Sequence, residues 1–374
     1  MLLQPSADLE AGVQCSSSTI MTTKVGSTER QDGASDEATY DYEPLPSDSA
    51  VRLIQICPDG TEVHGFSLTI RSFILRDAPA FCCLSYTWKS ATVSRPKDHC
   101  NNYGDNEAAA TVAVKSGDRV IAISENLFEF LCRARDEGWF TPENMRGGSQ
   151  HTLELNDGAT ATAFPSYLWV DAISINQNDT QERSQQVSMM GDIYSLSQIV
   201  LVWLGKSGPS PRAERVFRDF VPKFLAVIAA EGLAPFKNKD PFCYDTDLIR
   251  RLGDETCVQW RGDWTSFFLY LVRCRWFRRG WIIQEVVLKS VDNVDRVVVL
   301  CGSLGILWID LLQFLAIFTD PDWRRTLRRR LQSHDEETNT WAFEFSHLLQ
   351  SASRSCVLES GSRCIPWANP QNRS

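Results

Sequence analysis

The chain has 374 residues, of which 43% are hydrophobic and 23% are charged, so it contains enough apolar material for a folded core. Asp and Glu number 47 against 38 Lys and Arg, which gives a formal net charge of −9 and an isoelectric point near 5.2. A general nucleic-acid binder needs a basic face to neutralise phosphates, so this charge balance excludes that class and leaves only a local basic patch.

The cysteines and the apolar segments bear on the cellular compartment. The twelve cysteines include no CxxC pair, a pattern that is typical of reduced core thiols rather than of a zinc site or a disulfide scaffold. The N-terminus lacks a basic region followed by an apolar run, and the most apolar stretch, residues 304–318, is too short to span a bilayer. We therefore expect a cytoplasmic protein with no transmembrane segment and no bound metal.

In chain order, the sequence divides into a tail, a folded domain and an extension. Residues 1–48 predict a disordered tail, because their polar composition cannot bury enough apolar surface to offset the entropy of ordering. The folded domain is expected at 49–302, and a helical extension with an irregular end at 303–374. Three insertions are expected within the domain, at about 90–118 (a long polar surface loop), 141–163 (rich in Gly, Ser and Thr) and 206–265 (mixed and partly helical).

Apolar runs of strand length alternate with segments of helical periodicity. The first helix is expected to start at an N-cap, Ser124, and to stop at Gly138. The second is expected to start at Asp179, with Glu182 in capping-box spacing. Apolar strands separated by helices are typical of a parallel sheet covered by helices. The expected strands are 51–56, 81–88, 119–124, 167–175, 199–205 and 295–302, and further helices are expected at 213–232, 279–290 and 304–318.

The stretch YLWVDAISINQNDTQERSQQ, residues 167–186, places Asp171 in an apolar run that predicts a buried strand. Carboxylates are seldom fully buried unless they are paired. A loop rich in amides follows and leads into a helix. Ligands of open α/β sheets bind beyond the carboxyl ends of the strands. We therefore expect one crevice to be rimmed by Ser85, Tyr86, Asp171, Asn176 and Gln177.

Three segments resemble the signature blocks of the fungal heterokaryon-incompatibility domain, the HET domain: CLSYTW (83–88), residues 167–205, and RCRWFRRGWIIQE (273–285). The resemblance covers about residues 51–302 and implies a fungal protein of non-self recognition and innate immunity. Such proteins trigger programmed cell death, which implies self-association or binding to another cell-death signalling protein. This chain departs from the usual family pattern at Lys89 (usually Gly), Ser174 (often Cys) and Arg275 (often Pro).

HET domains are also distantly similar to TIR domains, which share a flavodoxin-like parallel sheet and some of which cleave NAD at the nicotinamide bond. This second resemblance implies a flavodoxin-like, TIR-like fold and an alternative function as an NAD glycohydrolase, with NAD as substrate and no cofactor. In such TIR domains the catalytic Glu follows a Trp by four residues, a spacing that Trp281 and Glu285 reproduce. A carboxylate there would stabilise the cationic sugar, while Arg278 and Arg279 would hold the pyrophosphate.

These residues also have structural interpretations. Glu285 precedes Lys289 by four residues, an order that suits a surface helix pair. Asp171 can instead tie down the loop at 174–179 by accepting backbone N–H bonds. The five arginines of residues 323–332 predict a solvated helix face, with a nucleic-acid or membrane contact as the weaker alternative. The sequence thus leaves open a non-enzymatic signalling module and an NAD-cleaving effector.

Overall fold

The chain divides into two units, residues 1–36 and 37–374, and all the residues whose structure is described here belong to the second. The computed structural model describes residues 38–60, 62–92, 110–142, 164–231, 260–279, 286 and 296–317.

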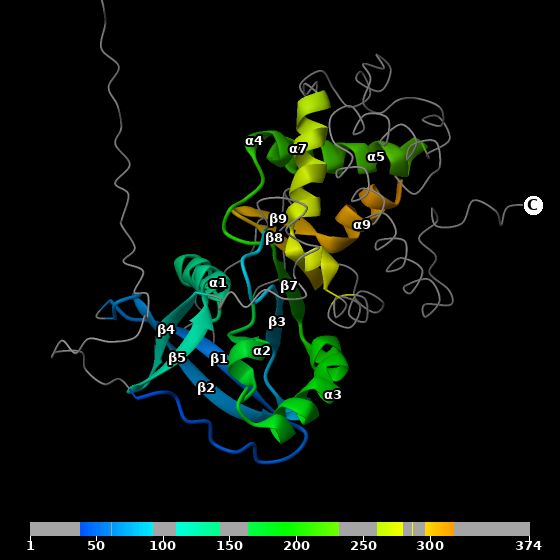
Figure 1. Ribbon diagram of the computed structural model, residues 1–374. Helices are drawn as coiled ribbons and strands as arrows, with labels where there is room; N and C mark the ends of the chain where they lie inside the picture. Colours follow the sequence, from blue (N-terminus) through cyan, green and yellow to red (C-terminus); the bar gives the residue numbers. More distant parts are fainter. Residues whose placement is uncertain are drawn as a thin grey trace, which may run out of the picture. The chain divides into compact units, whose positions relative to one another are not determined.

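One mixed sheet organises this part of the chain (Figure 1). Its strands are β1 (Ala50–Pro58), β2 (Phe66–Ile74), β3 (Phe81–Ser85), β6 (Tyr167–Trp169), β7 (Ile199–Trp203), β8 (Val297–Cys301) and β9 (Leu304–Leu307). They lie in the order β2-β1-β6-β3-β7-β8-β9. The central strands β6, β3, β7 and β8 are parallel, which confirms the α/β class. The expectation of a parallel sheet is wrong at both edges, where β1 pairs antiparallel with both β6 and β2, and β9 pairs antiparallel with β8.

Strand β7 shows why its sequence is a continuous apolar run. Val200 and Val202 belong to a core cluster on one face of the sheet, whereas Ile199, Leu201 and Trp203 belong to the cluster on the other face. Successive side chains of a strand point to opposite faces, so a strand that is covered on both sides must be apolar at every position.

Helices cover the first of these faces. They are α3 (Thr180–Leu196), α4 (Pro211–Arg215), the π-helical turn η4 (Val216–Phe220), α5 (Val221–Glu231), α7 (Trp260–Arg273) and α9 (Trp308–Ile317). In Figure 1, α4, α5, α7 and α9 gather near β8 and β9, whereas α3 lies near β3. The helix expected at 213–232 is confirmed as far as it is described.

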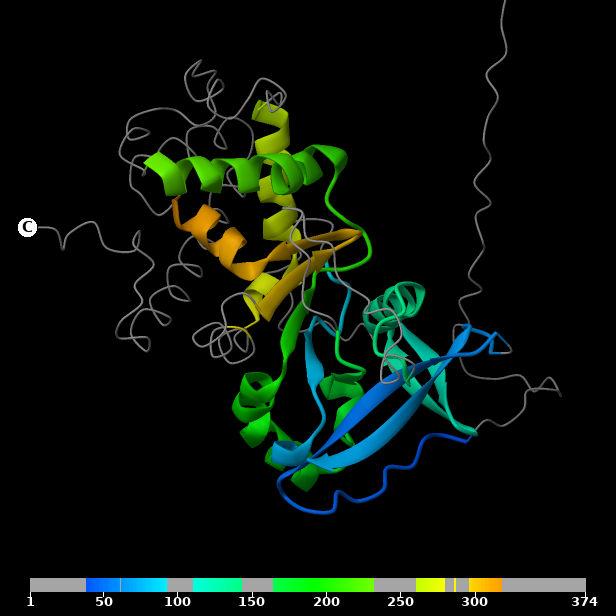
Figure 2. The same cartoon turned by 180° about the vertical axis from the view of Figure 1, so that it is seen from behind.

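A helix and a hairpin cover the second face. These are α1 (Glu125–Asp136) and the antiparallel pair β4 (Thr111–Ser116) and β5 (Arg119–Ser124), seen from behind in Figure 2. The N-cap at Ser124 is confirmed, since its hydroxyl accepts the Leu127 N–H at 3.4 Å. Gly138 has φ of 69° and ends the helix as expected. The polar loop expected at 90–118 is wrong over β4, where alternating valines give a strand periodicity that the surrounding polar residues hide.

The N-terminal boundary of the fold also needs a correction. Residues 38–48 were expected in the disordered tail, but they lie along the folded domain. The Tyr40 N–H donates to the Val120 carbonyl at 2.8 Å, and the Val120 N–H donates to the Ala38 carbonyl at 3.1 Å. The Tyr42 hydroxyl donates to the Ile173 carbonyl at 2.9 Å. Backbone pairing and the two tyrosines thus hold a segment whose composition alone predicts disorder.

The C-terminal boundary shifts as well. The segment from Leu304 was expected to begin a helix outside the domain, but Leu304–Leu307 form β9 and extend the sheet beyond residue 302. Gly302, with φ of 58°, makes the tight turn from β8. The expected helix begins only at Trp308. No helix in the described ranges has the length and apolarity that a membrane span requires.

Several predictions fall outside the described residues. These are the tail at 1–37, most of the insertions (93–109, 143–163 and 232–259), nearly all of the helix expected at 279–290, and the extension beyond 317 with its arginine-rich segment.

Candidate functional site

The first signature block touches both of the others. Ser85 ends β3, and its hydroxyl accepts the indole N–H of Trp276 at 2.7 Å, with both side chains buried. Trp276 lies in the short helix η7 (Arg275–Arg278). Three residues after Ser85, the indole N–H of Trp88 donates to the Asp171 carboxylate at 3.0 Å. The parallel pairing of β3 with β6 brings these strand ends together.

Tyr86 lies between these contacts and is almost fully buried. Burial is the main cause that raises the pKa of its hydroxyl well above the usual value, and the nearby Asp171 carboxylate raises it further. The Ser124 side chain and the charge of Arg279 act in the opposite direction. Tyr86 is therefore neutral, and in the described part of the chain its buried hydroxyl has no hydrogen-bond partner. The charges of Asp171 and Arg279 shift the pKa of this hydroxyl in opposite directions.

The position of Asp171 corrects one expectation. Strand β6 ends at Trp169, so Asp171 does not lie in a buried strand; it begins the short helix α2 (Asp171–Ser174) and is half-buried. Its carboxylate accepts the Ala172 N–H at 2.7 Å in addition to the Trp88 indole. A carboxylate is favoured at this place because the first N–H groups of a helix have no intrahelical partner.

The amide-rich loop is held mainly by a residue other than Asp171. The Asn176 N–H donates to the Glu182 carboxylate at 2.7 Å, and the Asn176 side-chain oxygen accepts the Asn178 N–H at 3.1 Å. The Gln177 side chain donates to the backbone carbonyl of Asp171 at 2.9 Å. The idea that the Asp171 carboxylate ties down this loop is therefore wrong for Asn176, whose N–H binds Glu182.

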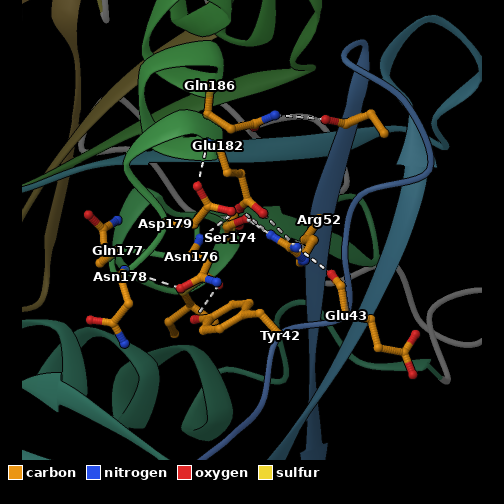
Figure 3. Close-up of polar contacts among 12 residues, drawn as sticks. Tyr42, Glu43, Arg52, Ser174, Asn176, Gln177, Asn178, Asp179, Glu182 and Gln186 are labelled. Atoms are coloured by element: carbon orange, nitrogen blue, oxygen red, sulfur yellow. Dashed lines mark hydrogen bonds and ion pairs between the residues drawn. The ribbon is translucent and has the colours of Figure 1, made fainter.

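An ion pair lies at the centre of this region (Figure 3). Arg52 of β1 forms two bonds with the Glu182 carboxylate of α3, at 2.5 and 2.9 Å, and the side chains are 3% and 11% exposed. The guanidinium also donates to the carbonyls of Glu43 at 2.6 Å and Ser174 at 3.3 Å, and it lies 5.0 Å from the centre of the Tyr42 ring. We call the group of Arg52, Ser174, Asn176, Gln177 and Glu182 the amide corner.

Sequence analysis missed this pair. Glu182 was assigned to a capping box, and the N-cap itself is confirmed, because the Asp179 carboxylate accepts the N–H groups of Gln181 at 2.8 Å and Glu182 at 3.0 Å. Arg52 lies in an otherwise mostly apolar strand. Because a buried charge is seldom unpaired, this position indicates a carboxylate partner. The sequence does not say which carboxylate that is.

A cavity of about 530 Å³ opens where the order of the parallel strands reverses. In chain order the parallel strands are β3, β6, β7 and β8, and β6 and β7 flank β3 on opposite sides. The connections that leave β3 and β7 therefore run in opposite directions along the sheet. In open α/β sheets, ligands bind in the crevice between two such connections. The lining includes Trp88, Lys89, Ser90, Ala91 and Thr92 after β3, Leu204, Gly205, Lys206 and Ser207 after β7, Glu125, Asn126 and Glu129 of α1, Ala110 and Arg275. We call it the switch-point cavity.

Two residues fix the walls of the switch-point cavity. Gly205 has φ of 101°, and a Cβ at this position would lie 2.5 Å from the Ala91 Cβ, so only glycine allows the two loops to approach. The buried Asn126 side chain donates to the Thr87 carbonyl at 2.7 Å and holds the start of the loop that leads out of β3.

Charges of both signs line the cavity. Lys89, Lys206 and Arg275 are basic, and Glu125 and Glu129 are acidic, so the lining carries a local excess of one positive charge in a chain of net charge −9. Burial raises the pKa of Glu129, while the charge and the backbone N–H of Lys206 act to lower it. In the described part of the chain, the buried Nε of Arg275 has no hydrogen-bond partner.

The predicted site residues thus separate into three groups. In the first group, Ser85 is hydrogen-bonded to Trp276 and Asp171 to Trp88, and the charges of Asp171 and Arg279 both shift the pKa of Tyr86. Asn176 and Gln177 lie in the amide corner. Trp281 and Glu285, together with the side chain of Arg278, lie outside the described residues.

Comparison with known families identifies the domain. Residues 150–285 match the family model of the heterokaryon incompatibility protein, HET. The chain carries a HET domain. Heterokaryon incompatibility protein 6, OR allele, of Neurospora crassa is 25% identical over 262 residues, which make up 67% of this chain and 34% of that protein. The chain therefore spans about a third of the length of this curated relative, and no solved structure matches it.

The matched segment, residues 150–285, includes Asp171, Trp276 and every residue of the amide corner except Arg52. The strand that carries Arg52 and the loop that carries Trp88 precede it in the chain. The contacts of Arg52 and Trp88 thus join the matched segment to the N-terminal part of the fold.

Proposed function

We propose that this HET domain is a non-self recognition module that triggers programmed cell death when it self-associates or binds another cell-death signalling protein. The observation that carries the proposal is the family match over residues 150–285, supported by a relative named for heterokaryon incompatibility. The contacts of Ser85 with Trp276 and of Trp88 with Asp171 support a single module, because they join all three signature blocks. We propose a cytoplasmic location for this activity.

Forced clustering tests this proposal. The full chain would be fused to a domain that dimerises on addition of a small molecule and expressed in fungal cells. We expect colony counts to fall only when the dimeriser is added, because assembly supplies the signal. A fusion to a dimerisation domain that cannot bind the small molecule is the matched control. Unchanged viability in cells where cross-linking demonstrates assembly would contradict the proposal.

We further propose that the parallel core is flavodoxin-like. Numbered in chain order, the four parallel strands lie in the order 2-1-3-4. This order agrees with the first four positions of the flavodoxin-like order 2-1-3-4-5. An experimental structure that shows a different order of these strands would overturn this assignment.

The second candidate function is NAD cleavage by Glu285, with Trp281 and Arg278 at the substrate. The observation that favours it is that Ser85 and Asp171, two of the expected substrate-binding residues, are each hydrogen-bonded to another signature block, Ser85 to Trp276 and Asp171 to Trp88. A polar, partly buried cluster of this kind beside the strand ends supports a ligand site. NAD would then be the substrate, and no cofactor is needed.

Release of nicotinamide decides between the two candidates. The clustered full chain would be incubated with NAD, and free nicotinamide would be followed by chromatography. Cleavage predicts release that disappears in Glu285→Gln while the thermal unfolding midpoint stays the same. The absence of release from a sample that is demonstrably assembled would exclude cleavage and leave signalling by assembly.

A further inference from the structure

We infer that the switch-point cavity binds a nucleoside phosphate, a ligand in which a flat ring is joined to a phosphate through a sugar. The inference concerns binding by residues that lie outside the predicted site. It requires neither clustering nor cleavage, so it goes beyond both proposed functions. The volume of the switch-point cavity, about 530 Å³, suits a small molecule, because small-molecule binding sites usually measure roughly 300–1,000 Å³.

A fixed aromatic residue provides a surface for the ring. Trp88 lines the cavity and is 45% exposed, although its indole N–H is hydrogen-bonded to Asp171 at 3.0 Å. An exposed indole that is already held in place loses little conformational freedom when a ring stacks on it. Stacking on an aromatic side chain depends little on which base is bound, so we expect the cavity to accept more than one kind of base.

Basic side chains from three separate segments provide for the phosphate. Lys89 follows β3, Lys206 follows β7, and Arg275 lies in η7, so the fold converges three cations on one cavity. A guanidinium binds phosphate oxygens through paired donors, and an ammonium adds a point charge.

The two carboxylates argue for a nucleoside rather than a bare anion. Glu125 and Glu129 line the same cavity and would repel an inorganic anion. Ionised carboxylates accept hydrogen bonds, so they suit the hydroxyls of a sugar. A ligand that carries a ring, hydroxyls and a phosphate matches the whole lining, whereas phosphate alone matches only its basic part.

Calorimetric titration of the full chain with adenosine 5′-monophosphate tests the inference. We expect saturable binding, with adenosine and inorganic phosphate each at least about tenfold weaker, because each lacks one of the two matched parts. Trp88→Ala should weaken binding about tenfold, whereas Trp88→Phe should stay within about threefold of the original protein because it keeps a flat ring. Lys206→Gln should weaken binding about fivefold or more.

Matched controls make each outcome decisive. Lys223→Gln removes an exposed lysine of α5 away from the cavity and should leave the affinity unchanged. Lys206 is also exposed, so its replacement should not affect folding, which circular dichroism would verify. No binding by the folded protein, equal binding of inorganic phosphate or adenosine, or equal affinity in all the variants would overturn the inference.

The test also separates this inference from NAD cleavage. Nucleotide binding that depends on Trp88 and Lys206, without any release of nicotinamide from NAD by the assembled chain, would support the cavity and exclude the second candidate function. If nicotinamide is released but the nucleotide affinity does not change when Trp88 or Lys206 is replaced, NAD cleavage would be supported and binding in the cavity would be excluded.

Discussion

The amide corner and the switch-point cavity are both polar regions beside the strand ends, but they differ in how their polar groups are used. In the amide corner, both carboxylate oxygens of Glu182 and both terminal nitrogens of Arg52 are hydrogen-bonded within the protein. In the cavity, by contrast, the Trp88 indole is half exposed and Lys206 is exposed.

This difference shows that polarity alone does not mark a ligand site. A region whose hydrogen-bonding groups are already matched stabilises the fold, whereas a region with remaining capacity can bind another molecule. Gln186 next to the amide corner illustrates the limit. Its side-chain oxygen has no partner in the described structure, but the residue is fully buried, so no ligand can reach it.

The largest expected effect comes from breaking the amide corner. Glu182→Ala leaves the guanidinium of Arg52 buried without its counter-charge, so we expect the free energy of unfolding to fall by about 3–5 kcal/mol. Urea denaturation measures this change. Glu214→Ala is the matched control, because it removes the partner of Arg218 in an exposed helix pair and should cost less than about 0.5 kcal/mol. Similar losses in the two variants would show that the amide corner is not structural.

The second effect concerns the walls of the cavity. Gly205→Ala places a methyl group 2.5 Å from the Ala91 Cβ at a backbone angle that disfavours side chains, so we expect a loss of about 1–3 kcal/mol in unfolding free energy. Nucleotide affinity should fall as well. Gly60→Ala, which meets open space, should change stability by less than about 1 kcal/mol. A Gly205→Ala variant as stable as Gly60→Ala would mean that the loops do not approach in this way.

A smaller effect is expected at Trp88, which lines the cavity and donates a hydrogen bond to Asp171. Trp88→Phe removes the hydrogen bond to Asp171 at a partly exposed position, so stability should fall by about 1 kcal/mol or less. Trp276→Phe breaks a buried bond to Ser85 and should cost more, about 1–3 kcal/mol. Thermal unfolding of both variants measures the order, and the reverse order would contradict the burial of Trp276.

The smallest effect is a dependence on pH. Burial raises the pKa of Glu129, so the folded state disfavours its ionised form, and its contribution to stability declines as the pH rises through the ordinary and then the raised pKa. Glu129→Gln removes this penalty. We expect the variant to gain stability relative to the original protein at pH 7 and to lose that gain at acidic pH. A gain that grows as the pH falls would contradict the direction of the shift.

The sequence predicted those parts of the fold that depend on local signals. The N-caps at Ser124 and Asp179 and the apolar run of β7 follow from residues that are close together in the chain. Strand β4 was missed because polar residues surround its alternating valines. Residues 38–48 were missed because distant partners, Val120 and Ile173, hold a segment of polar composition. Pairing with partners so distant in the chain leaves no local signal.

The site was predicted only in part for the same reason. Ser85 ends β3, and Asp171 closely follows β6, which pairs in parallel with β3, so the two residues lie at one edge of the sheet, as the strand pattern indicates. The pairing of Arg52 with Glu182 joins residues 130 positions apart in the chain. Lys89 and Arg275 stood out as departures from the family pattern, but only the fold shows that they line the same cavity.

A crystal of the full chain grown with adenosine 5′-monophosphate tests most directly the claim that the amide corner is structural and the switch-point cavity binds ligand. We expect density for a ring against Trp88 and for a phosphate near Lys206 and Arg275, with the ion pair of Arg52 and Glu182 intact. A nucleotide seated instead over Asn176 and Gln177, with the cavity filled by protein atoms, would contradict it.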